Sequence, residues 1–305
     1  MDNKLYLETE KMSNARSTSY SPFRLDKGTI DELLSHQGLH LLDANTIIEN
    51  DSDFQGRYRD TQKREIDVKT LNNLLNDSDT FISGASLSET ISIISRANPS
   101  LYQKLKERLS AKKSKKIINQ FDKRLSTDFG DLDGFNNVLD LLESGYGNPT
   151  LMRKEEKSAL YDEAVTEYIS SKSDEERDES VFKYFMAFTL DVAGSVDQGD
   201  KPNQQNILFD AYNVAMGLMF SYKCAEQGKS QPIYLTTSDG DVENILVGIE
   251  DTLSDIGDDC THRPYDLRKE VETEQEKELI GYLNDCIMNV VPESKIEYER
   301  NMKKK

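Results

Sequence analysis

Acidic residues at several separated points of the chain adjoin short apolar runs, and together they could hold a metal ion. Asp43 directly follows the apolar run Leu39–Leu42, and Glu89 lies about six residues beyond the run Thr80–Ser83. Carboxylate oxygens are the ligands that Mg²⁺ and Mn²⁺ prefer. A cation held in this way can activate water and polarise a phosphate group, so these residue types suggest phosphodiester chemistry.

Three more acidic residues lie in the second half of the chain. Asp210 lies in a segment with helical periodicity, whereas Asp239 and Asp241 follow the apolar run Ile233–Thr236. Ligands of open parallel sheets bind at the carboxyl ends of the strands, so we expect these side chains to meet at that edge. Such a cluster of carboxylates would be unstable through mutual repulsion unless a cation occupied it.

The elements that must position these residues alternate along the chain. Short apolar runs predict the strands Leu39–Leu42, Thr80–Ser83 and Ile233–Thr236, with a last short strand or loop at 261–265. Helical periodicity is found at 30–35, 71–75, 87–96, 203–227, 241–256 and 272–290. This order is typical of an α/β fold, and we predict an α/β/α sandwich on a parallel sheet.

The segment between the second and third strands is different. Apolar residues recur at helical spacing, and the charged run 170–179 separates two such stretches; the stretches are 101–121, 135–142, 157–169 and 180–192. We therefore predict a large all-helical insertion. The expected organisation is a loose N-terminal segment 1–28, an α/β core 29–96 and 203–266, the helical insertion 97–202, and a C-terminal helix and tail 267–305.

Four short blocks around the acidic residues resemble the PIN-domain nucleases. They are Asp43-Ala44-Asn45, Leu87-Ser88-Glu89-Thr90, Asp210-Ala211-Tyr212-Asn213 and Thr237-Ser238-Asp239-Gly240-Asp241, in the order found in that family. The resemblance covers about 39–96 and 203–265. The chain departs from the family in its long helical block and in having Val242, where an aromatic residue often follows the last acid.

This resemblance implies a PIN-like, divalent-metal-dependent endoribonuclease. Asp43, Glu89, Asp210 and Asp239 would be catalytic and hold Mg²⁺ or Mn²⁺, with Asp241 supporting or replacing Asp239. Asn45 and Thr237 would orient carboxylates or water. Such an enzyme would act in RNA processing or as a toxin or defence effector, with a possible inhibitor or partner protein. A structure-selective DNA nuclease and a non-catalytic PIN-like binding or scaffold module are the alternatives.

Simpler explanations exist for each acidic residue taken alone. An Asp after a strand can be a turn residue. Ser86 and Glu89 have the spacing of a capping box, which would make Glu89 a helix cap. Asp239 and Asp241 could form a turn and the N-cap of a helix beginning at Val242.

The charge distribution bears on the binding partner. The chain carries a net charge of −18, yet the segment 104–124 contains nine basic and two acidic residues. Because acidic side chains repel the backbone of a nucleic acid, a basic surface is needed to bind it, and we expect this segment to contact RNA. The residues concerned are Lys104, Lys106, Arg108, Lys112, Lys113, Lys115 and Lys116.

Other features narrow the class of protein. No apolar run has the roughly 18–20 residues that a membrane span needs. The three cysteines are Cys224, Cys260 and Cys286, and so few and scattered thiols favour a reduced, cytoplasmic protein. No phosphate-binding glycine loop is present, which argues against an ATP- or NAD-dependent enzyme. The oligomeric state is not indicated by the sequence.

Overall fold

The structure is a computed structural model that describes the chain in part and divides it into two compact units. The first comprises Met1–Gly145 and Leu235–Asp239, and the second Tyr146–Tyr234 and Gly240–Lys305. The described residues are 39–44, 80–83, 85–86, 89–90, 117–118, 154–195, 204–229, 233–237, 240–256, 262–263, 266–270 and 273–283.

The first unit contains a small sheet. The strands of the sheet are β1 (Leu39–Leu42), β2 (Thr80–Ser83), β3 (Ile117–Ile118) and β4 (Ile233–Thr236), in the order β3-β2-β1-β4. The first unit includes β4 from Leu235 onward. β1 and β2 run parallel, as do β2 and β3. Leu41 and Phe81 are paired and buried, so apolar side chains of β1 and β2 form part of the core of this unit.

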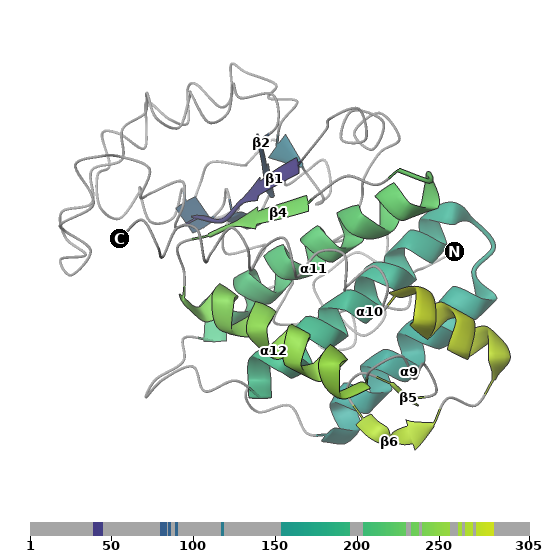
Figure 1. Ribbon diagram of the computed structural model, residues 1–305. Helices are drawn as coiled ribbons and strands as arrows, with labels where there is room; N and C mark the ends of the chain where they lie inside the picture. Colours follow the sequence, from purple (N-terminus) through teal and green to yellow (C-terminus); the bar gives the residue numbers. More distant parts are fainter. Residues whose placement is uncertain are drawn as a thin grey trace, which may run out of the picture. The chain divides into compact units, whose positions relative to one another are not determined.

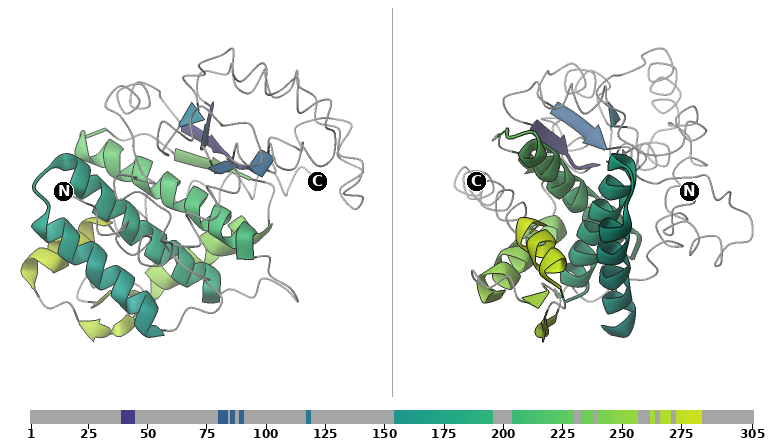
Figure 2. Two further views of the ribbon diagram at one scale, coloured as in Figure 1. Left: turned by 180° about the vertical axis from the view of Figure 1, so that it is seen from behind. Right: turned by 90° about the vertical axis from the view of Figure 1, so that its right-hand side faces the viewer.

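The second unit is a bundle whose main described elements are four long helices. They are α9 (Lys154–Ser170), α10 (Asp174–Ser195), α11 (Gln204–Glu226) and α12 (Gly240–Ile256). α10 packs against α9, α11 and α12, and α9, α10 and α11 lie side by side in that order (Figures 1 and 2). Every residue at 207–222 of α11 is buried, which a helix achieves only with neighbours on all sides.

Local hydrogen bonds define where α10 begins. Ser173 Oγ accepts the N–H of Glu176 at 3.2 Å, and Glu176 Oε2 accepts the N–H of Lys172 at 2.7 Å. These two bonds resemble a capping box, because each side chain accepts a donor that the helix leaves unpaired. Asp174 and Glu175 add negative charge to the first turn, where it complements the helix dipole.

The end of α11 is fixed by a glycine. Gly228 has φ 63°, a left-handed conformation that residues with a Cβ rarely adopt. The N–H of Lys229 donates to the Cys224 carbonyl, and that of Gly228 to the Ala225 carbonyl, each at 2.9 Å. This is a Schellman motif, which pairs the last carbonyl groups of the helix and turns the chain away.

The described part of the second unit also contains a strand pair and a shorter helix. β5 (His262–Arg263) and β6 (Asp266–Glu270) form an antiparallel pair. Residues 274–283 are helical, and Thr273 Oγ1 caps this helix by accepting the N–H of Glu276 at 3.1 Å. Of the strand or loop predicted at 261–265, the described residues His262–Arg263 form a strand, and β6 was not predicted.

The predicted fold class is wrong. We expected a parallel-sheet α/β/α sandwich of PIN-like build, but the described residues are mainly helical, and the strands have only two to five residues. Most buried hydrophobic side chains among the described residues belong to α9, α10, α11 and α12, which pack on one another. The helices thus bury their apolar residues in a bundle, because 180–190 of α10 and 207–222 of α11 are buried throughout and need neighbours on all sides.

Two local predictions within the helical block also need correction. Ile117 and Ile118 form the short strand β3, although 97–202 was expected to contain no strand. The charged run 170–179 is exposed or half-buried, as expected, but it is not a break over its whole length, because α10 begins at Asp174. The expected domain boundaries stay a prediction. The second compact unit groups α11, which was expected in the α/β core, with α9 and α10, which were expected in the helical insertion.

Candidate functional site

The candidate site lies at the carboxyl end of β1. Asp43 directly follows this strand, and the residue is only 1% exposed. Leu42 is paired with Ile82 in the parallel β1–β2 ladder, so Asp43 and Ser83 come at the same edge of the sheet. Burial of a carboxylate is unfavourable unless hydrogen bonds compensate the loss of water, so its partners decide whether the arrangement is stable.

Two hydrogen bonds hold the Asp43 carboxylate. Oδ1 accepts the N–H of Ala44 at 2.7 Å, and Oδ2 accepts the hydroxyl of Thr237 at 2.9 Å. Thr237 follows β4, so this contact joins the ends of two neighbouring strands. Both donors fix the orientation of the carboxylate.

The end of β2 is occupied by a serine pair rather than by an acid. Ser83 Oγ accepts the N–H of Ser86 at 3.0 Å and donates to Ser86 Oγ at 3.1 Å. The first of these bonds is that of a helix N-cap. Thr90 Oγ1 donates to the Ser86 carbonyl at 2.7 Å, so Ser86 already lies within the helix.

This arrangement changes the interpretation of Glu89. The capping-box explanation is wrong, because Ser83 and not Ser86 caps the helix. Glu89 is half-buried in the helix that follows β2, and its role as a metal ligand stays a prediction. Sequence reasoning missed Ser83. Its spacing of three residues to Ser86, just after an apolar run, is the signal that could have found it.

Asp210 and Asp241 belong to the helical unit. Asp210 lies on α11 and is 5% exposed, whereas Asp241 is half-buried in the first turn of α12. The helix begins at Gly240, so Asp241 is not the N-cap of a helix beginning at Val242, and that interpretation is wrong. An acid in the first turn complements the helix dipole.

The remaining predicted site residues lie outside the described residues. They are Asn45, Asp239, Lys104, Lys106, Arg108, Lys112, Lys113, Lys115 and Lys116. Within the described ranges, no three His, Cys, Asp or Glu side chains form a group that could hold a metal ion. Of the predicted residues, the structure brings Asp43 and Thr237 into contact.

The chemistry open to this site follows from its oxygen groups. An oriented, buried carboxylate next to a hydroxyl can bind a hard cation or accept a proton.

No family model matches the chain, and no curated protein and no solved structure matches it. No helix in the described part of the chain combines the length and the apolar character that crossing a membrane requires.

Proposed function

We propose that the chain is a divalent-metal-dependent nuclease that cleaves RNA, with Asp43 at the centre of its site. The observation that carries this proposal is the buried Asp43 carboxylate, which the Thr237 hydroxyl holds at a strand end. The proposal keeps the chemistry implied by the four acidic blocks and does not depend on the fold of the nucleases that they resemble.

The residues at this position fit a hard divalent cation. Asp43 offers carboxylate oxygens, and its two hydrogen bonds fix them in one orientation, as partners of metal ligands commonly do. Mg²⁺ or Mn²⁺, when bound, would supply Lewis-acid polarisation of the phosphate and a more acidic water. The further carboxylates that the proposal assigns to the cation are Glu89, Asp210, Asp239 and Asp241.

A nucleic acid is the proposed substrate because of the contrast in charge along the chain, and the resemblance to the PIN-domain nucleases implies RNA. The segment 104–124 has nine basic residues in a protein of net charge −18. In the proposal, this segment contacts the phosphate backbone while Asp43 serves the reaction, because a carboxylate site by itself repels a polyanion. A cytoplasmic location is part of the proposal, because the three cysteines of the sequence are few and scattered.

A second candidate function is supported by the same hydrogen bonds. Both oxygens of Asp43 already accept a hydrogen bond from the protein, which is what a purely structural carboxylate needs. A non-catalytic binding module would keep Asp43 for this reason alone. The two functions differ in one measurable respect, which is the dependence of activity and melting temperature on a divalent cation.

The test compares the wild-type protein with two isosteric variants. Asp43→Asn removes the charge at the site, and Asp251→Asn removes one exposed charge from α12 as the matched control. End-labelled RNA and DNA of one sequence are incubated with each protein in Mn²⁺ or in EDTA. We expect RNA cleavage that requires Mn²⁺, survives Asp251→Asn, and falls at least about 100-fold in Asp43→Asn.

Each other result has a definite meaning. Cleavage of DNA alone, lost in Asp43→Asn, would assign the site to DNA. Cleavage that Asp43→Asn leaves unchanged would exclude Asp43 as the centre of the reaction. If Mn²⁺ neither supports cleavage nor raises the melting temperature of the wild-type protein, the nuclease proposal is wrong and the non-catalytic binding module is favoured.

A further inference from the structure

The helical unit contains a pocket that the proposed function does not use. It has a volume of about 420 Å³ and lies between the end of α9, the beginning of α10 and the helix at 274–283. Its lining residues are Tyr168, Ile169, Ser171, Arg177, Gln275, Glu278, Leu279 and Tyr282. A volume of this size falls within the range of roughly 300–1,000 Å³ typical of small-molecule sites.

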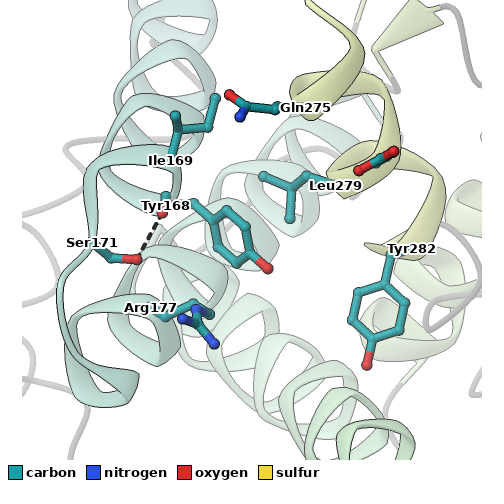
Figure 3. Close-up of a pocket in the computed structure, with 8 residues that line it drawn as sticks. Tyr168, Ile169, Ser171, Arg177, Gln275, Leu279 and Tyr282 are labelled. Carbon is teal, nitrogen blue, oxygen red and sulfur yellow. Dashed lines mark hydrogen bonds between the residues drawn. The ribbon is translucent and has the colours of Figure 1, made fainter.

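Aromatic and apolar groups supply two sides of this pocket. Tyr168 and Arg177 line one side, and Leu279 and Tyr282 line the other (Figure 3). The four lining residues of the C-terminal helix have the spacing i, i+3, i+4 and i+7, so they share one face of that helix. Ile169 at the rim is 45% exposed, which is unusual for a large apolar side chain here. The pocket therefore offers surfaces for a flat ring.

Arg177 gives the pocket a positive group. Its guanidinium lies 6.0 Å from the centre of the Tyr168 ring, a cation–π arrangement that helps to position it. Its ion pair with Asp174 spans 3.5 Å, and the Asp174 side chain is 93% exposed, so water screens this attraction. A guanidinium has five N–H donors in a planar fork that matches a phosphate group, so Arg177 suits an anionic ligand.

Residues outside the pocket make contacts that position its walls. Tyr282 packs edge-to-face on Tyr222 with ring centres 5.5 Å apart, and the Tyr222 hydroxyl donates to Glu226 at 3.0 Å. Lys223 Nζ donates to both carboxylate oxygens of Asp178 at 2.8 Å, which ties α11 to α10 next to Arg177. These contacts within the protein position the side chains of the pocket, so binding would require little further ordering of them.

We propose that this pocket binds a nucleotide. The base lies against the rings of Tyr168 and Tyr282, and the phosphate accepts hydrogen bonds from Arg177. Glu278 and Gln275 supply a carboxylate and an amide that can pair with ribose hydroxyls or with the edge of the base. A bare anion would not use the aromatic walls, and an uncharged ring would not use Arg177. The inference goes beyond the proposed nuclease function, because it rests on other residues.

The experiment is calorimetric titration of the full-length protein with AMP, GMP, CMP and UMP, with the matching nucleosides, and with inorganic phosphate. We expect at least one nucleotide to bind more tightly than its nucleoside and more tightly than phosphate. Arg177→Gln should weaken nucleotide binding about 10-fold or more and leave nucleoside binding unchanged. Lys172→Gln, an exposed position that does not line the pocket, is the matched control and should bind as the wild type does.

Further variants separate ring contacts from charge and from the site at Asp43. Tyr282→Leu should weaken both nucleotide and nucleoside binding, whereas Tyr282→Phe keeps the ring and should retain both. Asp43→Asn should leave nucleotide binding intact. The proposal is overturned if no nucleotide binds, if phosphate binds as tightly as the nucleotides, or if Arg177→Gln and Lys172→Gln have equal effects. Loss of binding in Asp43→Asn would also overturn it, whatever the outcome for cleavage.

Discussion

The hydroxyl of Thr237 donates a 2.9 Å hydrogen bond to Oδ2 of Asp43, a residue 194 positions earlier in the chain. One partner follows β1 and the other follows β4, and these strands are neighbours in the sheet. Asp43 is buried, so its carboxylate loses its hydration on folding, and this hydrogen bond compensates part of that loss. The contact therefore links the pairing of the two strands to the charge at the candidate site.

Removing the Thr237 hydroxyl should destabilise the protein. Thr237→Val keeps the shape of the side chain but leaves Oδ2 of a buried carboxylate without this donor, so we expect a loss of about 1–3 kcal/mol in the free energy of unfolding. Thr237→Ser restores the donor and should recover most of the loss. Urea unfolding followed by circular dichroism measures both.

A matched control for this variant is Thr252→Val on α12. The Thr252 hydroxyl donates to the Gly248 carbonyl one turn earlier, a bond that the helix does not need. We expect a change within about 0.5 kcal/mol for this variant. Equal losses for Thr237→Val and Thr252→Val would mean that the bond to Asp43 has no special energetic importance.

The serine pair after β2 leads to a second prediction. Ser83→Ala removes the N-cap of the following helix and should lower the free energy of unfolding by about 1 kcal/mol, within a range of roughly 0.5–2. Glu89→Gln leaves the bond between Ser83 and Ser86 in place, so it should lower stability less than Ser83→Ala does. A capping box of Ser86 and Glu89 would give the opposite ranking, so thermal unfolding of the two variants distinguishes the arrangements.

The positions of single strands and helices could be predicted from the sequence, but the elements on which they pack could not. The strands Leu39–Leu42, Thr80–Ser83 and Ile233–Thr236 were predicted with the bounds that they have. The all-round apolar character of α11 was also visible, but the pattern does not say which element covers it. One of the elements that pack on α11 is α10, whose Thr189 Oγ1 donates a 3.2 Å hydrogen bond to the Ala211 carbonyl of α11. Because α11 packs on other helices, the sandwich was the wrong fold class.

The candidate site shows the same limit. Sequence position after a strand was enough to select Asp43, and the structure places it buried at a strand end. The Thr237 contact is the kind that a residue orienting Asp43 needs, and its functional role stays a prediction. Ser83 was missed because Ser86 has a more familiar cap pattern, and only the hydrogen bonds decide between two serines three residues apart.

The ion pair between Lys223 and Asp178 should make stability depend on alkaline pH. Burial acts to lower the pKa of Lys223, but hydrogen bonds to Asp178 and Glu226 outweigh it, and the pKa lies above its ordinary value of 10.5. Burial raises the pKa of Asp178 more than Lys223 lowers it. A base with a raised pKa in the folded state stabilises the protein fully below its unfolded pKa, and this contribution is lost as the pH rises through the folded value.

We therefore expect Lys223→Met to lower the free energy of unfolding by about 1–3 kcal/mol at pH 7–9. The difference from the wild type should shrink as the pH rises above about 10.5, since both proteins then lack the charge. Urea unfolding at a series of pH values gives this difference, and Lys172→Met, at an exposed position, is the control. A difference that does not vary up to pH 12 would show that Lys223 acts through packing and not through its charge.

A buried lysine between two acids gives the last prediction. Lys183 on α10 is 1% exposed, and its Nζ lies 2.8 Å from Glu163 Oε1 and 3.7 Å from Glu167 Oε1, both on α9. Lys183→Met keeps the length of the side chain but leaves two carboxylates close together with no cation between them. We expect a loss of about 3–5 kcal/mol in the free energy of unfolding.

The same physics predicts a rescue. Replacing Glu163 and Glu167 by Met in the Lys183→Met background removes the uncompensated charges, and apolar side chains of similar length fill the space between α9 and α10. The triple variant should unfold within about 1 kcal/mol of the wild type, because a buried ion network is seldom more stabilising than an apolar replacement. Lys277→Met, from an exposed pair with Glu274, should change stability by less than about 1 kcal/mol. The loss in the triple variant is compared with the sum of the losses in Lys183→Met, Glu163→Met and Glu167→Met. If the two are equal, Lys183 and the two acids do not act as one charged group, and α9 and α10 are held together by their apolar contacts alone.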